Sequence, residues 1–397
     1  MRAEAATPRP PVLDDNHALF RMQRGILVAG LVALAACALG GWFGPAQFFH
    51  SYLVGFMFWF GIALGSMAIL MVSHLTGGAW GAVVRRLLES AARTTPVLAL
   101  LFLPILLGMH ELYSWTRPEV VRESEILQHK QIYLNVPFFL VRAAIYFAVW
   151  VTVSRFLSVW SLEQDGNPGR NVSRRLEFLS RGGLVLYGLT VTFAAFDWVM
   201  SLEPLWYSSI FGFLFMGAQG LAAFSFVIPV AAYLRRTSPL ARVIEPKQFH
   251  DLGNLMLAFL MLWAYLSFSQ LLIIWEGNLP DEISWYLHRA DTGWFWIGIG
   301  LIVFHFALPF VLLLLRAIKR NPALLAPVAL LVMVARYFDM LWLVEPSLHQ
   351  TRLHVSWMDV VAPIGIGGVW LAAFVGQLKG ISLVPLNDPS LPGAADV

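Results

Sequence analysis

Two nine-residue stretches place acidic side chains at matching positions. "FDWVMSLEP" contains Asp197, "FDMLWLVEP" contains Asp339, and each ends on a Glu-Pro pair. Proline disfavours helical backbone at the residue before it, so each stretch predicts a helix that ends near its glutamate. The two aspartates then lie ~5–9 Å inside the helix end, at 1.5 Å per residue. A carboxyl group at that depth is suited to reversible protonation, because loss of water favours its neutral form.

Two arginines stand at similar depth in other apolar stretches. Arg336 lies three residues before Asp339 on one helical face, which predicts an ion pair within the helix. The first stretch has Ala194 at the corresponding position, so we expect Arg142 to supply the partner of Asp197. Such pairs can fix helix register, but charges inside a membrane more often serve function.

Further ionisable groups extend this set. We expect Glu203 and Glu345 at the outer interface in water, and His305 is the deepest group, ~20 Å inside by helical rise. The inner half offers neutral polar groups, Ser66, Gln219 and Gln270. This distribution predicts half of a proton path entered from outside, or the rim of a site for an amphipathic molecule. The candidate proton-path or quinol-facing residues are His110, Glu111, Arg142, Asp197, Glu203, His305, Arg336, Asp339 and Glu345.

The elements that position these residues follow from composition. The 397 residues are 58% hydrophobic and 13% charged, whereas a soluble protein has about 25% charged residues. Apolar runs long enough to cross a ~30 Å hydrocarbon core recur throughout. We therefore predict an all-α polytopic membrane protein with transmembrane helices at residues 25–43, 48–74, 96–109, 134–160, 182–200, 208–233, 252–275, 293–315, 322–344 and 359–378. "GAVVRRLLES" is predicted to form a short amphipathic surface helix, and no secretory signal is expected in residues 1–24.

The basic residues segregate to one face of these ten spans. That face would receive most of them, including Arg2, Arg9 and Arg242. The positive-inside rule therefore places both termini in the cytoplasm. The other face would receive only Arg117, Arg122, Lys130, Arg289 and Arg352.

The matching stretches close two sets of four spans. An even number of spans per set gives both sets the same orientation, so we predict two parallel-repeat four-helix bundles rather than an inverted repeat. Convergence of two short helix ends is the alternative. The predicted units are an N-terminal tail (1–24), a first helix (25–47), the first bundle (48–204), the second bundle (205–346), and the tenth helix with a cytoplasmic tail (347–397).

The single cysteine, Cys37, limits the redox chemistry of this chain. It excludes intrachain disulfides, a covalent c-type haem and an iron–sulfur cluster held by this chain alone. A b-type haem needs two histidines at matching depth, and only His305 lies deep in a span. We therefore expect no cofactor bound by this chain, quinol being the one candidate ligand, and no nucleic-acid partner.

The arrangement resembles the polysulfide-reductase/NrfD-like family of membrane subunits. Residues 56–89, 196–213 and 250–282 are similar to the second NrfD-like subunit of alternative complex III, a bacterial quinol:electron-acceptor oxidoreductase. The resemblance implies a complex with a paralogous quinol-binding subunit, an iron–sulfur subunit, a multihaem cytochrome c subunit and small membrane subunits. It also implies the bacterial cytoplasmic membrane and haem and iron–sulfur clusters on the partners.

The role expected of this chain within such a complex is proton conduction and scaffolding, with a quinol site as a further candidate. Two other functions stay open on the sequence. One is a secondary transporter of a small solute, and the other is a purely structural anchor for extramembrane redox subunits.

Overall fold

A computed structural model describes residues 12–166, 170–238 and 245–387. Ten helices or helix runs in this part of the chain are long and apolar enough to cross a membrane, which confirms the predicted number. The protein is therefore a helical multi-pass membrane protein. Arg2, Arg9 and Arg242, and much of both predicted tails, lie outside the described residues.

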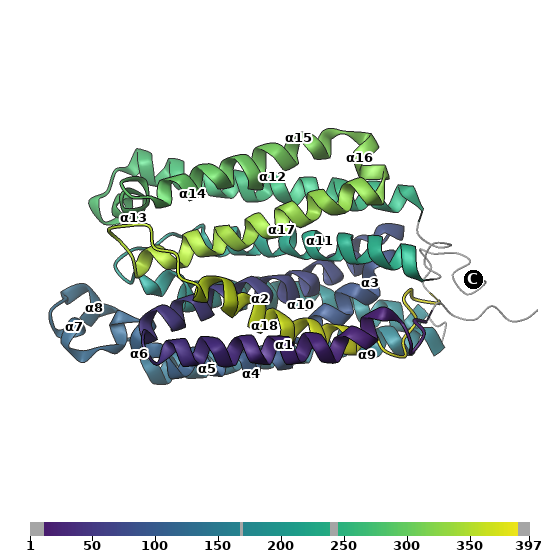
Figure 1. Ribbon diagram of the computed structural model, residues 1–397, viewed down its shortest axis with the longest axis horizontal. Coiled ribbons are helices and arrows are strands. Elements are labelled where there is room, and N and C mark those ends of the chain that lie inside the picture. The colour runs from purple at the N-terminus through teal and green to yellow at the C-terminus, as the bar shows by residue number, and fades with distance from the viewer. Residues whose placement is uncertain (1–11, 167–169, 239–244, 388–397) are drawn as a thin grey trace, which may run out of the picture.

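Each spanning element overlaps its predicted segment, but the first, third and fifth begin well before the predicted residue (Figure 1). Six spans are single helices: α1 (Ala18–Gly41), α2 (Pro45–Thr76), α9 (Val136–Gly166), α11 (Phe211–Thr237), α12 (Pro246–Gly277) and α18 (Met358–Gln377). Two continue into a 3₁₀ turn: α10 (Arg170–Trp198) into η2 (Met200–Leu202), and α17 (Pro322–Val344) into η5 (Glu345–Ser347). The third span joins α3 (Ala79–Ala92), α4 (Thr95–Leu101) and α5 (Leu103–Leu107). The eighth joins α14 (Trp294–Gly300), a π-helical segment η4 (Leu301–Ala307) and α15 (Leu308–Leu314).

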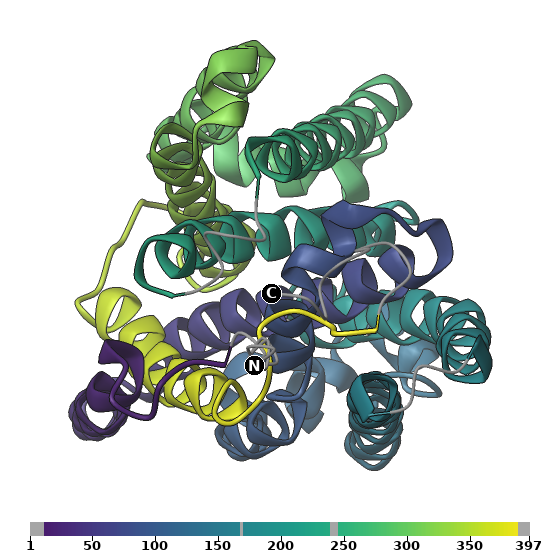
Figure 2. The ribbon, with the colours of Figure 1, turned by 90° about the vertical axis from the view of Figure 1, so that its right-hand side faces the viewer.

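Both ends of the described chain lie on one side of the helix bundle. An antiparallel β-bridge joins Val12 to Ser382 there, and Figure 2 views the molecule from that side. We call it the terminal side. The opposite, far side carries the short helices α6 (Met109–Leu112), α7 (Pro118–Arg122), α8 (Glu125–Lys130) and α13 (Pro280–Ala290).

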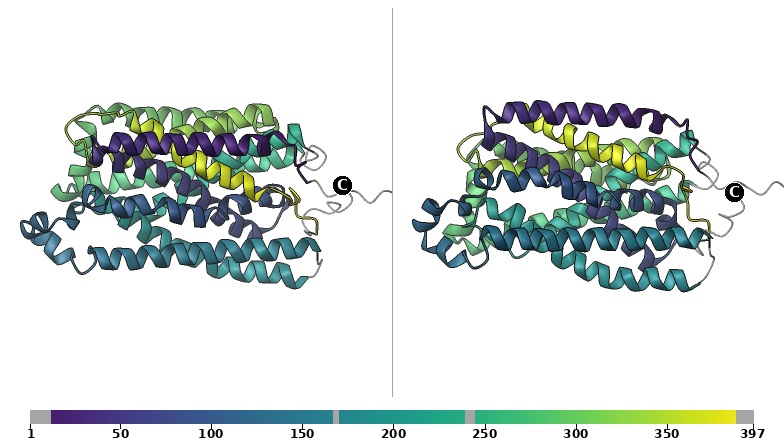
Figure 3. Two further views of the ribbon diagram at one scale, coloured as in Figure 1. Left: turned by 60° about the horizontal axis from the view of Figure 1, so that its bottom comes forward. Right: turned by 90° about the horizontal axis from the view of Figure 1, so that it is seen from below.

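Helix α2 forms the centre of the molecule. The most apolar stretch of α2 is completely buried, and the helix contacts α3, α10, α11, α17 and α18. By contrast, α1 lies at the edge of the bundle beside α18 (Figure 3), and most residues of its apolar stretch are not buried within the protein. An apolar helix that is exposed along its length is stable where lipid or another membrane subunit covers it.

The other helices group around α2 by contact. Helices α2, α3–α5, α9 and α10 contact one another in a ring, as do α11, α12, α14–α15 and α17. The two groups meet along α2 and α11 and along α10 and α11. This grouping uses the same helices as the two predicted bundles, while their origin in a duplicated unit stays a prediction.

Glycine permits the close contact between α2 and α11. A Cβ atom on Gly65 would lie 1.9 Å from the backbone oxygen of Gln219, whereas one on Gly61 would meet nothing nearer than 3.7 Å. The backbones of the two central helices therefore touch at Gly65. Small residues permit this kind of approach between membrane helices.

We expect Gly65→Ala to lower the free energy of unfolding by about 1–3 kcal/mol, because the added methyl group must push α11 away from α2. Gly61→Ala is the matched control on the same helix and should change stability little. Thermal unfolding of both variants in detergent measures the difference. Equal midpoints for the two variants would contradict the described contact.

Helix α3 differs from its prediction. The "GAVVRRLLES" segment is buried within the protein, including the side chains of Arg86 and Glu89. Its apolar face packs against α2, α11 and α12, and its charged side chains pair with α9, so no face is left for the surface. The third span accordingly begins at Ala79, well before residue 96, and continues across a turn at Arg93 and Thr94.

Candidate functional site

Arg142 and Asp197 form a buried ion pair near the far side. Helix α9 places Arg142 in its second turn, and α10 places Asp197 in its last turn. Arg142 Nε and Nη2 each donate to a different carboxylate oxygen of Asp197 at 2.9 Å. Tyr146, one turn after Arg142 on α9, donates its hydroxyl to Asp197 Oδ2 at 2.9 Å. The predicted pairing across two helices is confirmed.

The surroundings of this pair exclude water from the carboxylate. Asp197 is 0% exposed and Arg142 is 7% exposed. The guanidinium lies 3.9 Å from the ring centre of Tyr133 and 4.3 Å from that of Phe138, and it also donates to the Tyr133 carbonyl at 3.0 Å. Aromatic faces and a carbonyl stabilise a desolvated cation. The pair is therefore held by a complete set of partners.

The second pair lies on one helix. Arg336 donates to Asp339 Oδ2 within α17, as the spacing predicts, and both side chains are buried. Trp263 of α12 donates its indole N–H to the same oxygen at 3.2 Å. The Arg336–Asp339 prediction is confirmed, with a tryptophan as an added partner.

His305 joins this second cluster. Its ring centre lies 4.1 Å from that of Trp263, and the imidazole is 0% exposed. Neither ring nitrogen has a hydrogen-bond partner among the described residues. The π-helical turn of η4 carries the histidine, and such turns are frequent at functional sites. The cluster thus presents an imidazole with unused hydrogen-bonding capacity beside an ion pair.

Glu203 is paired with a cation that sequence reasoning did not select. Arg289 of α13 donates to Glu203 Oε1 at 3.2 Å and to the carbonyls of Trp342 and Leu343, also at 3.2 Å. Arg289 is 1% exposed, and burial lowers its pKa to about 10 although Glu203 opposes the shift. This arginine ties the far end of α10 to the far end of α17.

Glu345 is not at a wet interface, contrary to expectation. It is 0% exposed, because the turn η5 folds its side chain inward toward α2, where Gln47 donates to Oε2 at 3.3 Å. The same amide nitrogen donates to Asp359 Oδ1 at 3.1 Å. Sequence reasoning missed Asp359, since an acid in the first turn of a helix is ordinary capping.

His110 and Glu111 do not join these clusters. His110 is exposed and Glu111 is half-buried on α6. Their backbone carbonyls accept hydrogen bonds from Arg117, at 3.0 Å and 3.4 Å. The structure gives their side chains no shared position with Asp197 or Asp339.

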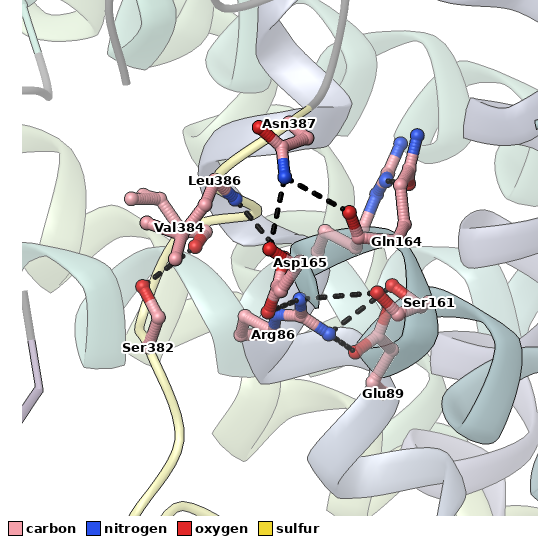
Figure 4. Close-up of polar contacts among 10 residues, drawn as sticks. Arg86, Glu89, Ser161, Gln164, Asp165, Ser382, Val384, Leu386 and Asn387 are labelled. Carbon is pink, nitrogen blue, oxygen red and sulfur yellow. Dashed lines mark hydrogen bonds and ion pairs between the residues drawn. The ribbon is translucent and has the colours of Figure 1, made fainter. Parts of the chain in front are cut away.

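The terminal side holds a buried charge cluster around Arg86, a residue expected on a surface helix (Figure 4). Arg86 donates to Glu89 at 2.7 Å, to Ser161 at 3.1 Å and to Asp165. The backbone N–H of Leu386 donates to Asp165 Oδ1 at 3.0 Å. The chain after α18 therefore closes over the end of α9.

The three neutral groups also differ in position. Gln270 lies toward the far side, where it accepts from Ser208 at 2.9 Å and donates to Tyr286 on α13 at 3.2 Å. Gln219 lies between helices and accepts from Tyr187 at 2.8 Å. Ser66 donates to a carbonyl of its own helix. Of these three groups, Gln270 therefore lies on the side opposite to the one expected.

Two small cavities lie away from the ion pairs. One, of about 130 Å³, is lined on the far side by Tyr207, Gln270 and Glu282. The other, of about 200 Å³, is lined on the terminal side by His74 and Arg85. Both are smaller than the ~300 Å³ at which ligand pockets usually begin. Among the described residues, no three His, Cys, Asp or Glu side chains are placed to hold a metal ion.

A scan of the chain against protein-family models and a search of curated proteins each found no match.

Proposed function

We propose that the chain is a non-redox integral subunit of a quinol:electron-acceptor oxidoreductase of the alternative complex III type, and that it conducts protons and scaffolds the complex. The observation that carries this proposal is the pair of buried Asp–Arg sites, Asp197 with Arg142 and Asp339 with Arg336, near one side of the bundle. Quinol oxidation releases protons, and carboxylates can accept them.

The geometry suggests how each pair handles a proton. The Asp197 carboxylate accepts two guanidinium bonds and one phenol bond, and only one of the three goes to Oδ1, so a lone pair on Oδ1 is left for a proton. When the carboxyl group is neutral, the guanidinium keeps its contacts with the ring and carbonyl of Tyr133. The arginine can thus remain desolvated while the aspartate changes charge. Loss of the proton restores the ion pair.

In the proposed role, the cluster around Asp339 carries proton binding and release toward the middle of the bundle. Trp263 contacts both Asp339 and His305, and His305 has two nitrogens without a partner among the described residues. In the proposed role, the imidazole is the deepest group that exchanges a proton with Asp339.

The proposed role implies an orientation of the protein in the membrane and a set of partner subunits. The terminal side faces the cytoplasm of a bacterial cell and the far side faces the compartment of the electron acceptor. The paralogous quinol-binding subunit, the iron–sulfur subunit, the multihaem cytochrome c subunit and the small membrane subunits then cover the exposed apolar helices. Haem and iron–sulfur clusters belong to those partners.

Purification in mild detergent tests the assignment to such a complex. We expect an affinity-tagged chain to co-purify with iron–sulfur and multihaem subunits and with quinol oxidation activity. Isolation of the chain without these subunits, from membranes that contain them, would contradict the proposal. Uptake of a small solute by the purified chain in liposomes would favour the transporter.

A further inference from the structure

The far end of the bundle holds a second kind of acidic site, where α2, η5 and α18 meet. Gln47 is its centre, since its amide nitrogen donates to Glu345 at 3.3 Å and to Asp359 at 3.1 Å. Ser51 donates to Asp359 Oδ1 at 2.5 Å, and the backbone N–H of Ser356 donates to Oδ2 at 2.7 Å. Both carboxyl groups therefore contact one and the same nitrogen atom, Gln47 Nε2, which places the two side chains next to each other.

Among the described residues, no cation donates a hydrogen bond to either of these two acids. Glu345 is 0% exposed and Asp359 is 1% exposed. Among the described residues, the groups that donate to them are an amide, a hydroxyl and a backbone N–H, all neutral. The corresponding glutamate of the first stretch, Glu203, has Arg289 as its partner. Two adjacent buried carboxylates without a cation cannot both stay ionised.

One carboxyl oxygen at this site lacks a hydrogen-bond donor. Glu345 Oε1 is buried and has no hydrogen-bond partner among the described residues. A buried acceptor without a donor costs about 1–3 kcal/mol. A proton on one carboxyl group would supply a donor between Glu345 and Asp359, and it would also remove the repulsion between two like charges.

We propose that Glu345 and Asp359 share a single proton and form a proton-binding site at the far side of the protein. The shared proton follows from the contacts above. Its exchange during turnover rests on the proposed function.

Two histidines lead from this site outward. His349 Nε2 lies 2.7 Å from Gln47 Oε1, and its ring centre lies 4.5 Å from that of His354. Burial, together with the nearby His354, lowers the pKa of His349, so its imidazole stays neutral near pH 7 and can accept a proton. His349 is therefore a partly exposed imidazole that contacts the same amide group as the carboxyl pair.

Other titratable and charged groups surround the pair and contribute to any pH dependence. They come from α1, α2, α17 and the far-side loops, and they are Cys37, His50, Arg117, Tyr337, His349, Arg352 and His354. A measurement on the carboxyl groups themselves avoids this overlap.

Infrared spectroscopy of the purified protein in H₂O and D₂O at neutral pH tests the proposal. A protonated carboxyl group gives a carbonyl band that shifts on deuteration, and an ionised one does not. We expect Glu345→Gln and Asp359→Asn each to remove the same single band, and the double variant to remove no more than that one. Retention of all such bands in both single variants would overturn the shared proton.

Two further variants keep the test decisive. Glu203→Gln is the matched control and should remove no band, because Arg289 supplies the charge balance there. Ser51→Ala keeps both acids and should shift the band, since Ser51 donates to Asp359; if the other variants do not fold, an unshifted spectrum here overturns the proposal. If Glu345→Gln removes the band but leaves turnover unchanged, the shared proton stands and only its role in proton transfer is rejected.

Discussion

Substitution of Arg142 by alanine is expected to lower the free energy of unfolding by about 3–5 kcal/mol, the usual cost of leaving one member of a buried ion pair alone. Asp197 would then be 0% exposed in the native structure with only the Tyr146 hydroxyl as a side-chain donor. The protein must either protonate the carboxyl group or admit water to it.

A double-mutant cycle separates this cost from lost packing. Arg142→Ala with Asp197→Asn should recover most of the stability, because no charge is left without a partner. Arg142→Lys should fall between wild type and alanine, since an ammonium group cannot make the two parallel bonds of a guanidinium. Arg155→Ala, on the exposed face of the same helix, is the control. Additive effects of the two single substitutions, measured by thermal unfolding in detergent, would show that the pair is not coupled.

Much of the helical layout could be predicted because a membrane helix is encoded locally. An apolar run of sufficient length specifies a span wherever its neighbours lie, so α17 and α18 begin and end at, or next to, their predicted residues. The Arg336–Asp339 pair is local too, as both residues share one helix face. The Arg142–Asp197 pair was predictable because two isolated charges at the same depth have few other partners.

The misplaced residues depend on contacts between distant segments. The α3 segment was predicted to be a surface helix because it carries charged side chains. Nothing in the segment itself shows that Asp165 of α9 pairs with Arg86, or that the chain near Leu386 contacts Asp165. Glu345 was expected in water because Pro346 ends its helix. The burial of Glu345 depends on Gln47, 298 residues away.

The role of the aspartates in proton transfer carries the second large expected effect. General acid–base groups typically contribute about 10²–10⁴-fold to rate. We therefore expect Asp197→Asn and Asp339→Asn each to slow quinol-driven proton release by ~100-fold or more. Asparagine keeps the shape of the side chain but cannot bind and release a proton at neutral pH.

Assembly must be measured beside turnover. Asp291→Asn, at an exposed position between α13 and α14, is the control and should match wild type. Variants that fail to assemble with the partner subunits would indicate a structural anchor. Variants that assemble normally and lose proton release would indicate a proton path.

The most direct test is proton release from the purified complex in sealed vesicles, followed with a pH-sensitive dye after a pulse of quinol. The account predicts that the Asp197→Asn, Asp339→Asn double variant assembles with all its partners, and that its proton release is slowed by at least ~100-fold. Proton release at the wild-type rate from the fully assembled double variant would contradict it.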